Sequence, residues 1–563
     1  MNCSSKTTPI LGRVPVWIAL LIFFLSLYLL TANGRIDSGD GEAIYQVTRS
    51  MVEKRAFAIP PPPPEEKFYD SFGREIPEEL LDGGGAYGAW GADGHYYSKY
   101  GIGQSLIAIP LYLGGLILGR AGPYPGIHFF TRLSTAMLNP LVSALVCLLI
   151  FSFFAQLGFP TRSAFTLTLV YGLGTIAWPY SKTFYSEPLV TMFLLASVYA
   201  LVFRKGADRI KLLLAGALWG ASIMVKLTAL IVAPALLLYL IARGREKGQH
   251  SRDLVGNLAL LLAPVLGSML VIFWYNALRF GSGFDTGYRA VNWSLTGGAM
   301  GLYGLLFSSG RGLFLYMPIV ILSVPALLNF YKQHKWEATL FSLIIAAYIL
   351  FHSAYSSWEG GGVWGPRLLL PMIPFLIMPL GSFLSVISKR KWLEFLFAAF
   401  LVCSILIQLS AVSVSNIRHL QAVYADSPTS FYERTFFQPA YSPLLGQWRS
   451  LLEVSGIMRS EEGREGLRNM LLDRASDRES QEFSEDELSV AVQGDISILA
   501  LNVPDFWFIY LWLLGIPGSK LVLLVSGLVV ITLLSGYLLV SQIAVSSHSS
   551  MERGQLSQAQ NKG

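Results

Sequence analysis

The amino-acid sequence predicts an all-α polytopic membrane protein with about 12 transmembrane helices and one interfacial helix in the first outer loop. Of the 563 residues, 53% are hydrophobic and 14% are charged, whereas about 25% of residues are charged in ordinary soluble domains. Several apolar runs reach the roughly 20 residues that cross a bilayer as a helix. Lys and Arg cluster beside these runs, which follows the positive-inside rule and argues against nucleic acid as a partner.

The first apolar run, 14–30, follows a basic flank and is interpreted as a retained signal-anchor span that starts in the cytoplasm. The chain then enters an outer loop, 33–132. Within this loop, 104–118 is apolar but short, and Pro110 lies near its middle, so we expect an interfacial helix rather than a span. Treating 104–118 as a span would place most later basic clusters outside, against the positive-inside rule.

The distribution of charge then sets the remaining spans. Short connections that carry Lys and Arg are assigned to the cytoplasm, and long connections rich in Gly, Tyr and Trp to the outer face. The remaining predicted spans are 133–157, 163–179, 188–203, 212–224, 227–241, 254–278, 313–330, 338–354, 368–387, 392–412 and 521–544.

The chain divides into three predicted regions. Residues 1–412 form a transmembrane module, 413–517 a polar exofacial or periplasmic segment, and 518–563 the last span with a cytoplasmic tail. This arrangement predicts a multi-pass protein of the inner (plasma) membrane with its N- and C-termini in the cytoplasm.

The first candidate functional residues stand just past the first span. Asp40 and Glu42 are two residues apart, and Tyr45 and Arg49 follow at a spacing that shares one helical face. Acids at the end of a span cost little when solvated, so a simple polar flank is one interpretation. The other is a catalytic role, with Asp40 as general base for a hydroxyl group.

Two further outer connections carry charges. Lys99, with Tyr97 nearby, precedes the predicted interfacial helix. It is either an aromatic-belt anchor or a point charge that binds a lipid phosphate. Glu187 enters the membrane at the start of a predicted span, where an acid needs a partner. Lys226 lies on the same face, and the pair is either a structural ion pair or part of a substrate site.

The outer ends of later spans hold the remaining candidates. Arg289 and Arg311 lie in Gly-containing connections and are candidate phosphate ligands. The stretch from Trp358 to Arg367 contains two tryptophans, Glu359 and four glycines. Tryptophan faces stack on sugars and Arg binds phosphate through a bidentate fork, so a functional role is favoured over a purely interfacial belt. The Gly spacing fits no nucleotide-binding loop, and the three cysteines fit no zinc spacing.

These residues and the arrangement of spans resemble the GT-C superfamily of membrane glycosyltransferases. Within it, the chain is similar to the bacterial branch related to protein O-mannosyltransferases and lipid A aminoarabinose transferases. The family has an Asp, often Asp-Glu, in its first outer loop, which maps to Asp40, although Gly41 separates it here from Glu42. A Lys before an interfacial helix maps to Lys99, and an acid before span 4 maps to Glu187.

The resemblance implies a GT-C-like catalytic module over 1–412 and a hexosyl- or pentosyltransferase activity. The donor would be a polyprenyl-phosphate-linked sugar, and the acceptor a hydroxyl group of a lipid, glycan or protein at the periplasmic or extracellular face. Because the phosphate is already a good leaving group, the reaction requires a base, Asp40, and cations such as Lys99, Arg289 or Arg367 that stabilise the departing phosphate. Direct displacement would invert the anomeric centre.

No cofactor and no metal ligand set are expected, although some members of the superfamily bind a divalent metal through their outer-loop acids. A transporter or flippase of lipid-linked saccharides is the alternative function. Transporters usually hold their charges near the membrane midplane on broken helices, whereas the charges of this chain collect at the outer boundary of the spans.

Overall fold

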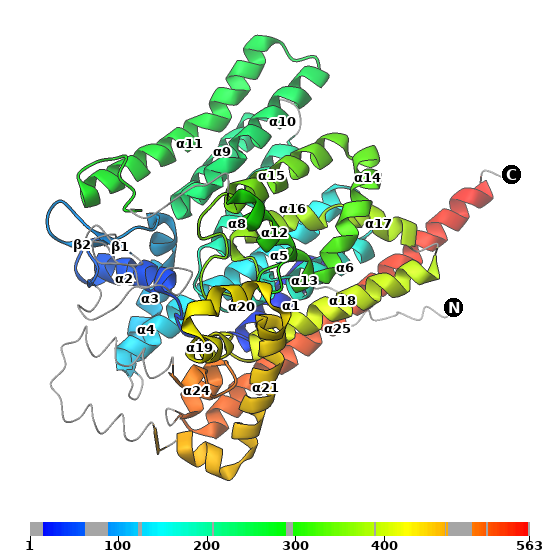
Figure 1. The fold of residues 1–563 in the computed structure, drawn as a ribbon. Coiled ribbons are helices and arrows are strands. Elements are labelled where there is room, and N and C mark those ends of the chain that lie inside the picture. Colours follow the sequence, from blue (N-terminus) through cyan, green and yellow to red (C-terminus); the bar gives the residue numbers. More distant parts are fainter. Residues whose placement is uncertain are drawn as a thin grey trace.

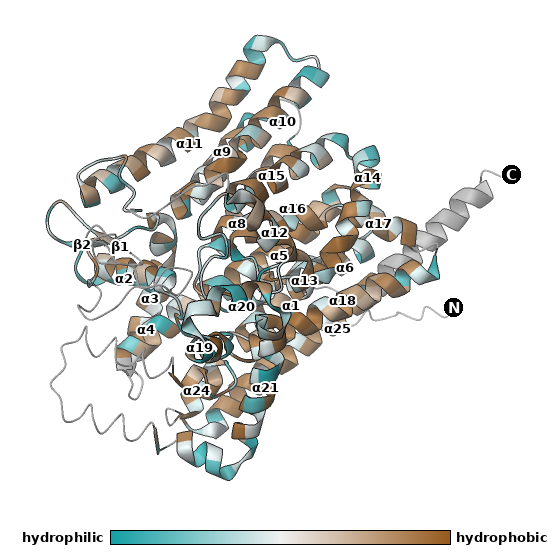
Figure 2. Cartoon of the chain, viewed as in Figure 1, coloured by the Kyte–Doolittle hydropathy of each residue, from teal (hydrophilic) through white to brown (hydrophobic). Residues whose placement is uncertain are grey.

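The structure is a computed structural model that describes residues 15–61, 88–121, 126–204, 208–288, 297–387, 390–467, 469–470, 498–513 and 516–560. As the sequence predicts, helices make up nearly all of the regular structure, and the described strands form one two-stranded sheet. The helices form a bundle (Figure 1). Apolar residues cover most of this bundle, and hydrophilic residues gather on its connections and on the helices between residues 417 and 459 (Figure 2).

Each predicted span coincides with one or more helices. The bundle helices in chain order are α1 (Val16–Leu30), α5 (Leu138–Gln156), α6 (Thr161–Gly174), α7 (Ala177–Ser181), α8 (Glu187–Val202), α9 (Arg209–Val225), η3 (Leu227–Val232), α10 (Ala233–Glu246), α11 (Ser251–Phe280), α12 (Gly298–Phe307), α13 (Leu313–Tyr316), η4 (Pro318–Leu322), α14 (Ser323–Gln333), α15 (Lys335–Ser353), η5 (Arg367–Met372), α16 (Ile373–Ile377), α17 (Leu380–Ile387), α18 (Lys391–Ser413) and α25 (Gly518–Gln560).

Seven of the described helices are long and apolar enough to cross a membrane, or eight if the bent pair Arg367–Ile377 and Leu380–Ile387 is one span. This number is smaller than the 12 predicted spans because several spans are short or interrupted helices. Proline lacks the N–H group that an uninterrupted helix requires, and Pro318 begins one of the interrupting 3-10 turns.

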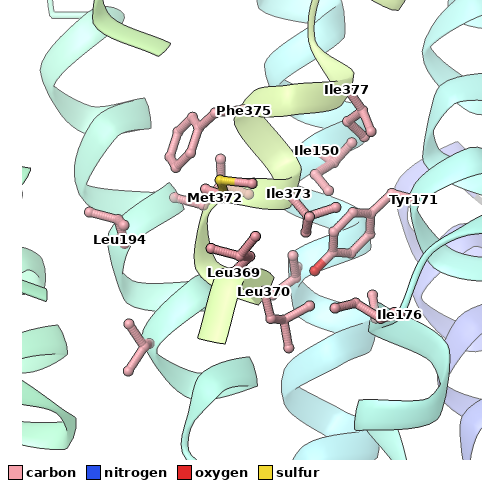
Figure 3. Packing of buried hydrophobic residues seen from close by; sticks show 14 of the residues in the cluster. Ile150, Tyr171, Ile176, Leu194, Leu369, Leu370, Met372, Ile373, Phe375 and Ile377 are labelled. Atoms are coloured by element: carbon pink, nitrogen blue, oxygen red, sulfur yellow. The ribbon is translucent and has the colours of Figure 1, made fainter. Parts of the chain in front are cut away.

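The interrupted stretch η5–α16 lies deep inside the bundle. Leu369, Met372 and Phe375 of this stretch pack among residues of other helices, such as Ile150 of α5 and Leu194 of α8 (Figure 3). These side chains are almost fully buried. The apolar surface that η5–α16 presents on all sides is therefore explained by helix–helix packing.

The first and last bundle helices, α1 and α25, pack antiparallel. The Thr532 hydroxyl donates to the Ser26 hydroxyl at 2.8 Å, and Gly536 faces Phe23 further back along α1. The start of α1 and residue 543 of α25 therefore lie toward the same end of the bundle, since residue numbers run in opposite directions along the pair.

The described residues of the predicted outer loop, 33–132, form α2 (Gly39–Glu53), β1 (Gly88–Trp90), β2 (Tyr96–Ser98), α3 (Ile102–Ala121) and α4 (Gly126–Ala136). Helix α3 is the predicted interfacial helix of 104–118, extended at both ends. Over Ile102–Arg120 it also meets the length and hydropathy of a span, so its position along the membrane surface stays a prediction. Gly115 and Gly119 of α3 allow α4 to approach closely, because a Cβ at either glycine would meet α4 backbone atoms at 2.5–2.6 Å.

The segment after α18 is also helical where the structure describes it. Its elements are α19 (Ile417–Asp426), η6 (Pro428–Ser430), α20 (Phe431–Phe437), η7 (Pro439–Tyr441), α21 (Pro443–Arg459) and α24 (Trp507–Leu513). A buried cluster fastens it to the start of the outer loop. Asp505 pairs with Arg35 at 3.1 Å and with Lys182 at 2.6 Å, and it accepts a hydrogen bond from Tyr510 at 2.5 Å. Burial opposes ionisation of Asp505, but the two cations outweigh it and hold its pKa well below the usual value.

Candidate functional site

A cavity of about 1200 Å³ opens where several helix ends meet. Its walls come from the start of α2, residues 99–102, the join of α9 and η3, the end of α11, the turn 357–362 and the helices α19 and α20. The ends of α9 and α11 and the start of η5, which the topology predicts on one face of the membrane, all reach this cavity. The charged side chains on its walls are Asp40, Lys99, Lys226, Arg279, Arg311, Glu359 and Arg367.

Asp40 lies in the first turn of α2 and faces the cavity. Ser38 caps this helix by accepting a hydrogen bond from the Gly41 N–H at 3.0 Å, and an acid in the first turn is favourable beside the helix dipole. One oxygen, Oδ1, accepts a hydrogen bond from the Tyr100 hydroxyl at 2.6 Å, and Oδ2 accepts one from Arg367 at 3.0 Å. The side chain of Asp40 is still 30% exposed.

The electrostatic surroundings keep Asp40 ionised. Burial raises its pKa, but Arg367 and the Tyr100 hydrogen bond outweigh burial, and Lys226 and Lys99 act in the same direction, so that the pKa is lowered overall. In turn, burial and the neighbouring carboxylate raise the pKa of the Tyr100 phenol well above its usual value. Asp40 is therefore a carboxylate and Tyr100 a neutral hydrogen-bond donor at neutral pH.

Arg367 links Asp40 to Glu187. Its Nε lies 3.5 Å from Glu187 Oε1, which also pairs with Lys226 Nζ at 2.7 Å. The ion pair between Glu187 and Lys226 that the sequence suggested is therefore formed. Lys226 and Arg367 line the cavity, whereas Glu187 is buried behind them. The Arg367 guanidinium also stacks on the Tyr185 ring at 4.2 Å.

Lys99 reaches the cavity from a loop that another arginine holds in place. Arg279, at the end of α11, donates to the carbonyl groups of Ser98 and Tyr100, on either side of Lys99. The Lys99 ammonium lies 5.1 Å from the centre of the Tyr288 ring. Burial lowers the Lys99 pKa, and this effect exceeds that of the opposite charge on Asp40.

The glycine-rich turn after Trp358 is fixed by Arg311. This side chain is fully buried and donates to the carbonyl groups of Glu359 at 3.0 Å and Gly361 at 2.7 Å. Gly360 and Gly361 have φ angles of +73° and +84°, which residues with a Cβ rarely adopt. The sequence predicted Arg311 as a candidate phosphate ligand. In the structure its guanidinium instead donates to backbone carbonyls of the turn that forms part of the cavity wall.

Several predicted site residues lie away from the cavity lining. Glu42 pairs with Arg132 of α4 at 2.5 Å. Arg49 pairs with Glu53 at 2.9 Å within α2. Tyr97 donates to Asp93 at 2.7 Å from the β-hairpin.

The predicted residues Trp358 and Arg289 have different outcomes. Trp358 is buried against Tyr432 and Phe436, so its ring packs inside the protein and is not part of the cavity lining. Arg289 lies outside the described residues. The predicted residues that line the same cavity are Asp40, Lys99, Lys226, Arg311, Glu359 and Arg367.

The cavity also contains residues to which the sequence assigned no role. Tyr100 directly follows Lys99, and this adjacency was the available signal for it. Tyr288 and Arg279 lie in or just before the Gly-containing connection in which only Arg289 was a candidate phosphate ligand. His352 lies inside an apolar run at the end of α15, and Tyr424 belongs to α19, and neither position offered a signal in the sequence.

The balance of charge favours an anionic ligand. Five cationic side chains and two carboxylates line the cavity, and Glu187 offsets one of the cations from behind. Among the residues that the structure describes, no three His, Cys, Asp or Glu side chains are grouped as a metal ion would require. The cations themselves can supply the positive charge that a phosphate group needs.

The fold and this cavity define a helical, multi-pass membrane protein with a charged pocket at the ends of its helices. Residues 127–274 match a protein family described as dolichyl-phosphate-mannose-protein mannosyltransferase. The matched region runs from α4 into α11 and includes Glu187 and Lys226. This match supports the resemblance to the GT-C superfamily. A search of curated proteins finds no significant match.

Solved structures with a similar fold include two of ArnT from Cupriavidus metallidurans. The apo form is 14% identical, with 86% of this chain and 75% of that chain covered and a TM-score of 0.44. The form bound to undecaprenyl phosphate is 14% identical, with 86% and 76% covered and a TM-score of 0.43. Archaeal oligosaccharyltransferase AglB from Archaeoglobus fulgidus, in complex with an inhibitory peptide and a dolichol-phosphate, is 10% identical, with 80% and 58% covered and a TM-score of 0.44.

Proposed function

We propose that the protein is a glycosyltransferase that moves a sugar from a polyprenyl-phosphate-linked donor to an acceptor hydroxyl group. One observation carries the proposal: an ionised carboxylate, Asp40, and a lysine, Lys99, face the same cavity. The first is the base that an acceptor hydroxyl needs, and the second is a point charge for a phosphate. The description of the matched family, whose sugar donor is a dolichyl phosphate, agrees with this chemistry.

The proposed reaction is a single displacement. The acceptor oxygen bonds to the anomeric carbon while the bond from that carbon to the phosphate oxygen breaks, and its electron pair leaves with the polyprenyl phosphate. Asp40 receives the acceptor proton, and Lys99 stabilises the growing charge on the phosphate. Because one carboxylate suffices and attack occurs opposite the leaving group, the anomeric centre is inverted.

The apolar part of the cavity suits the lipid part of the donor. Leu227, Leu230 and Ile231 of η3 and Ile272 of α11 line this part. Leu230 is 37% exposed. Such a wall removes a prenyl chain from water while the phosphate reaches the cations. A lipid-linked substrate requires both an apolar and a charged part of the pocket.

The cellular placement follows from the predicted topology. We place the cavity on the periplasmic or extracellular face of the inner (plasma) membrane, with both termini in the cytoplasm. The antiparallel packing of α1 and α25 supports termini on one side. The acceptor would be a lipid, glycan or protein that reaches this face, and α19 and α20, which line the cavity, would cover it from outside.

The decisive experiment uses the full chain in nanodiscs that contain a total lipid extract. Mannosyl, glucosyl and arabinosyl polyprenyl phosphates are supplied, and release of polyprenyl phosphate is measured. We expect one donor to be consumed and Asp40→Asn to lower the rate about 10²- to 10⁴-fold. Asp208→Asn is the matched control. Asp208 caps the N-terminal end of α9, whereas the C-terminal end of α9 lines the cavity, and Asn caps a helix as well as Asp does.

The alternative outcomes are distinct. Full activity of Asp40→Asn would refute the base assignment. If the lipid-linked sugar crossed the bilayer without being consumed, the function would be that of a flippase and not of a glycosyltransferase.

A further inference from the structure

Asp40 faces the cavity, and each of its carboxylate oxygens already accepts a hydrogen bond from another cavity residue. Oδ1 accepts the Tyr100 hydroxyl proton in a 2.6 Å hydrogen bond, and Oδ2 is held by Arg367. Both groups line the cavity together with Asp40. An acceptor hydroxyl that approaches the carboxylate therefore encounters a phenol on one oxygen and a guanidinium on the other.

The Tyr100 oxygen is suited to accept a proton from the cavity. A tyrosine hydroxyl donates one hydrogen bond and keeps lone pairs as an acceptor. Its single hydrogen points to Asp40, and no described side chain donates to its oxygen in any hydrogen bond found within the described residues. Arg367, by contrast, cannot take up the proton, because its guanidinium has only hydrogen-bond donors and stays protonated.

The position of Tyr100 is fixed on several sides. Arg279 donates to the Tyr100 carbonyl at 3.4 Å, and the ring of Tyr288 meets the Tyr100 ring edge-on at 6.3 Å. The Lys99 ammonium lies 5.6 Å from the centre of the Tyr100 ring. A phenol held in this way keeps one geometry toward Asp40, which short proton transfers require.

We propose that Tyr100 is a catalytic residue that relays the acceptor proton to Asp40, an inference that rests on the glycosyltransferase function proposed above. The acceptor O–H bond breaks and its proton bonds to the Tyr100 oxygen. At the same time the original phenol proton passes to Asp40 Oδ1. The acceptor oxygen bonds to the anomeric carbon, and the electron pair of the broken carbon–oxygen bond leaves with the phosphate.

The two proton transfers occur together. A stepwise route through tyrosinate would place a negative charge beside the Asp40 carboxylate, and burial with that carboxylate already raises the Tyr100 pKa strongly. The phenol is thus neutral before and after the reaction, and Asp40 is the final proton acceptor.

The first test is a variant. Tyr100→Phe removes the relay atom and keeps the ring. We expect the plateau of the single-turnover rate, above its acidic limb, to fall about 10- to 100-fold, with donor KM within about twofold of the wild type. If Tyr100 only positions Asp40, loss of its hydrogen bond raises the Asp40 pKa, so the acidic limb moves to higher pH while the plateau is retained, and that result would overturn the relay.

Tyr112→Phe is the matched control. The Tyr112 hydroxyl also donates to a carboxylate of α2, Glu53, at 2.5 Å, but it lies outside the cavity lining. We expect its plateau rate to stay within about twofold of the wild type. A fall equal to that of Tyr100→Phe would indicate a general effect on α2 and would overturn the relay.

The second test needs no variant. The single-turnover rate of the wild-type chain is measured in mixtures of H₂O and D₂O with the donor that the nanodisc assay identifies. A relay moves two protons together, so the rate depends on the deuterium fraction as a curve. A straight line, typical of one transferred proton, would overturn the relay while leaving the glycosyltransferase function in place. Failure of the wild type to consume any donor would refute the function itself.

Discussion

Arg367 Nη1 donates to Asp40 Oδ2 at 3.0 Å across 327 positions of the sequence. The same guanidinium lies 3.5 Å from Glu187, so one cation bridges two carboxylates from α2 and α8. Asp40 therefore stays ionised on the cavity wall, although its partial burial by itself would raise the pKa of the carboxylate.

This bridge predicts the pH dependence of activity. The lowered Asp40 pKa means that the base is ionised until the pH falls below the usual aspartate value of about 4. We expect kcat/KM for the donor to be constant through neutral pH and to fall only as the pH drops through this lowered value. The same shift stabilises the folded protein above the unfolded pKa and is lost as the pH falls through the folded pKa. A midpoint near pH 6 in the rate profile would contradict this assignment.

Replacement of Arg367 should shift the pH dependence of activity. Arg367→Met removes the largest influence that lowers the Asp40 pKa, so the acidic limb should shift to higher pH and the plateau rate should fall. Arg434→Met is the control, because Arg434 pairs with Asp426 at the surface and exposed pairs contribute about 0–1 kcal/mol. An unchanged acidic limb in Arg367→Met would show that Arg367 does not set the state of Asp40.

The Glu187–Lys226 pair should be coupled in stability. Lys226→Met leaves the buried Glu187 carboxylate with only the longer Arg367 contact, and we expect a loss of about 3–5 kcal/mol in the free energy of unfolding. The double variant Glu187→Gln with Lys226→Met should recover much of this loss, since it removes the uncompensated charge. Thermal unfolding in detergent measures the four members of the cycle. Additive effects of the two single changes would refute the coupling.

The Asp505 cluster should hold residues after α18 against the outer loop. Asp505→Asn removes the carboxylate that the buried Arg35 and Lys182 share and leaves Arg35 only the longer 3.4 Å pair with Asp37. We expect a clear fall in Tm and faster proteolysis after α18. Asp426→Asn, which breaks an exposed pair, serves as the comparison. Equal Tm and equal cleavage rates for the two variants would show that the cluster is not a fastening point.

Catalysis should not require a divalent metal. Lys99, Arg279 and Arg367 provide positive charge on the cavity walls, and phosphate stabilisation by such side chains needs no ion. We expect donor consumption to persist after treatment with EDTA. A loss of activity that Mg²⁺ or Mn²⁺ restores would assign a metal to the site.

Some parts of the site could be read from single residues. Asp40 was recognisable because Tyr45 and Arg49 follow it at helical spacing after the first span, and Lys99 because it precedes the predicted interfacial helix. Lys226 was recognisable as the partner that Glu187 needs. Glu42 shows the limit of this reasoning. It stands two residues after Asp40, but helical geometry turns it by about 200°, toward Arg132 of α4. Sequence proximity therefore did not translate into a shared cavity.

The sequence by itself determined that this protein is a helical membrane protein and where most of its helices lie, because hydropathy and charge act locally along the chain. Only the tertiary structure decided which outer residues face one another. The contacts of Asp40 with Arg367 and Tyr100, and of Arg279 with the Lys99 loop, join segments from distant helices. Such pairings depend on how helix ends pack in three dimensions, which leaves no periodic signal in the sequence.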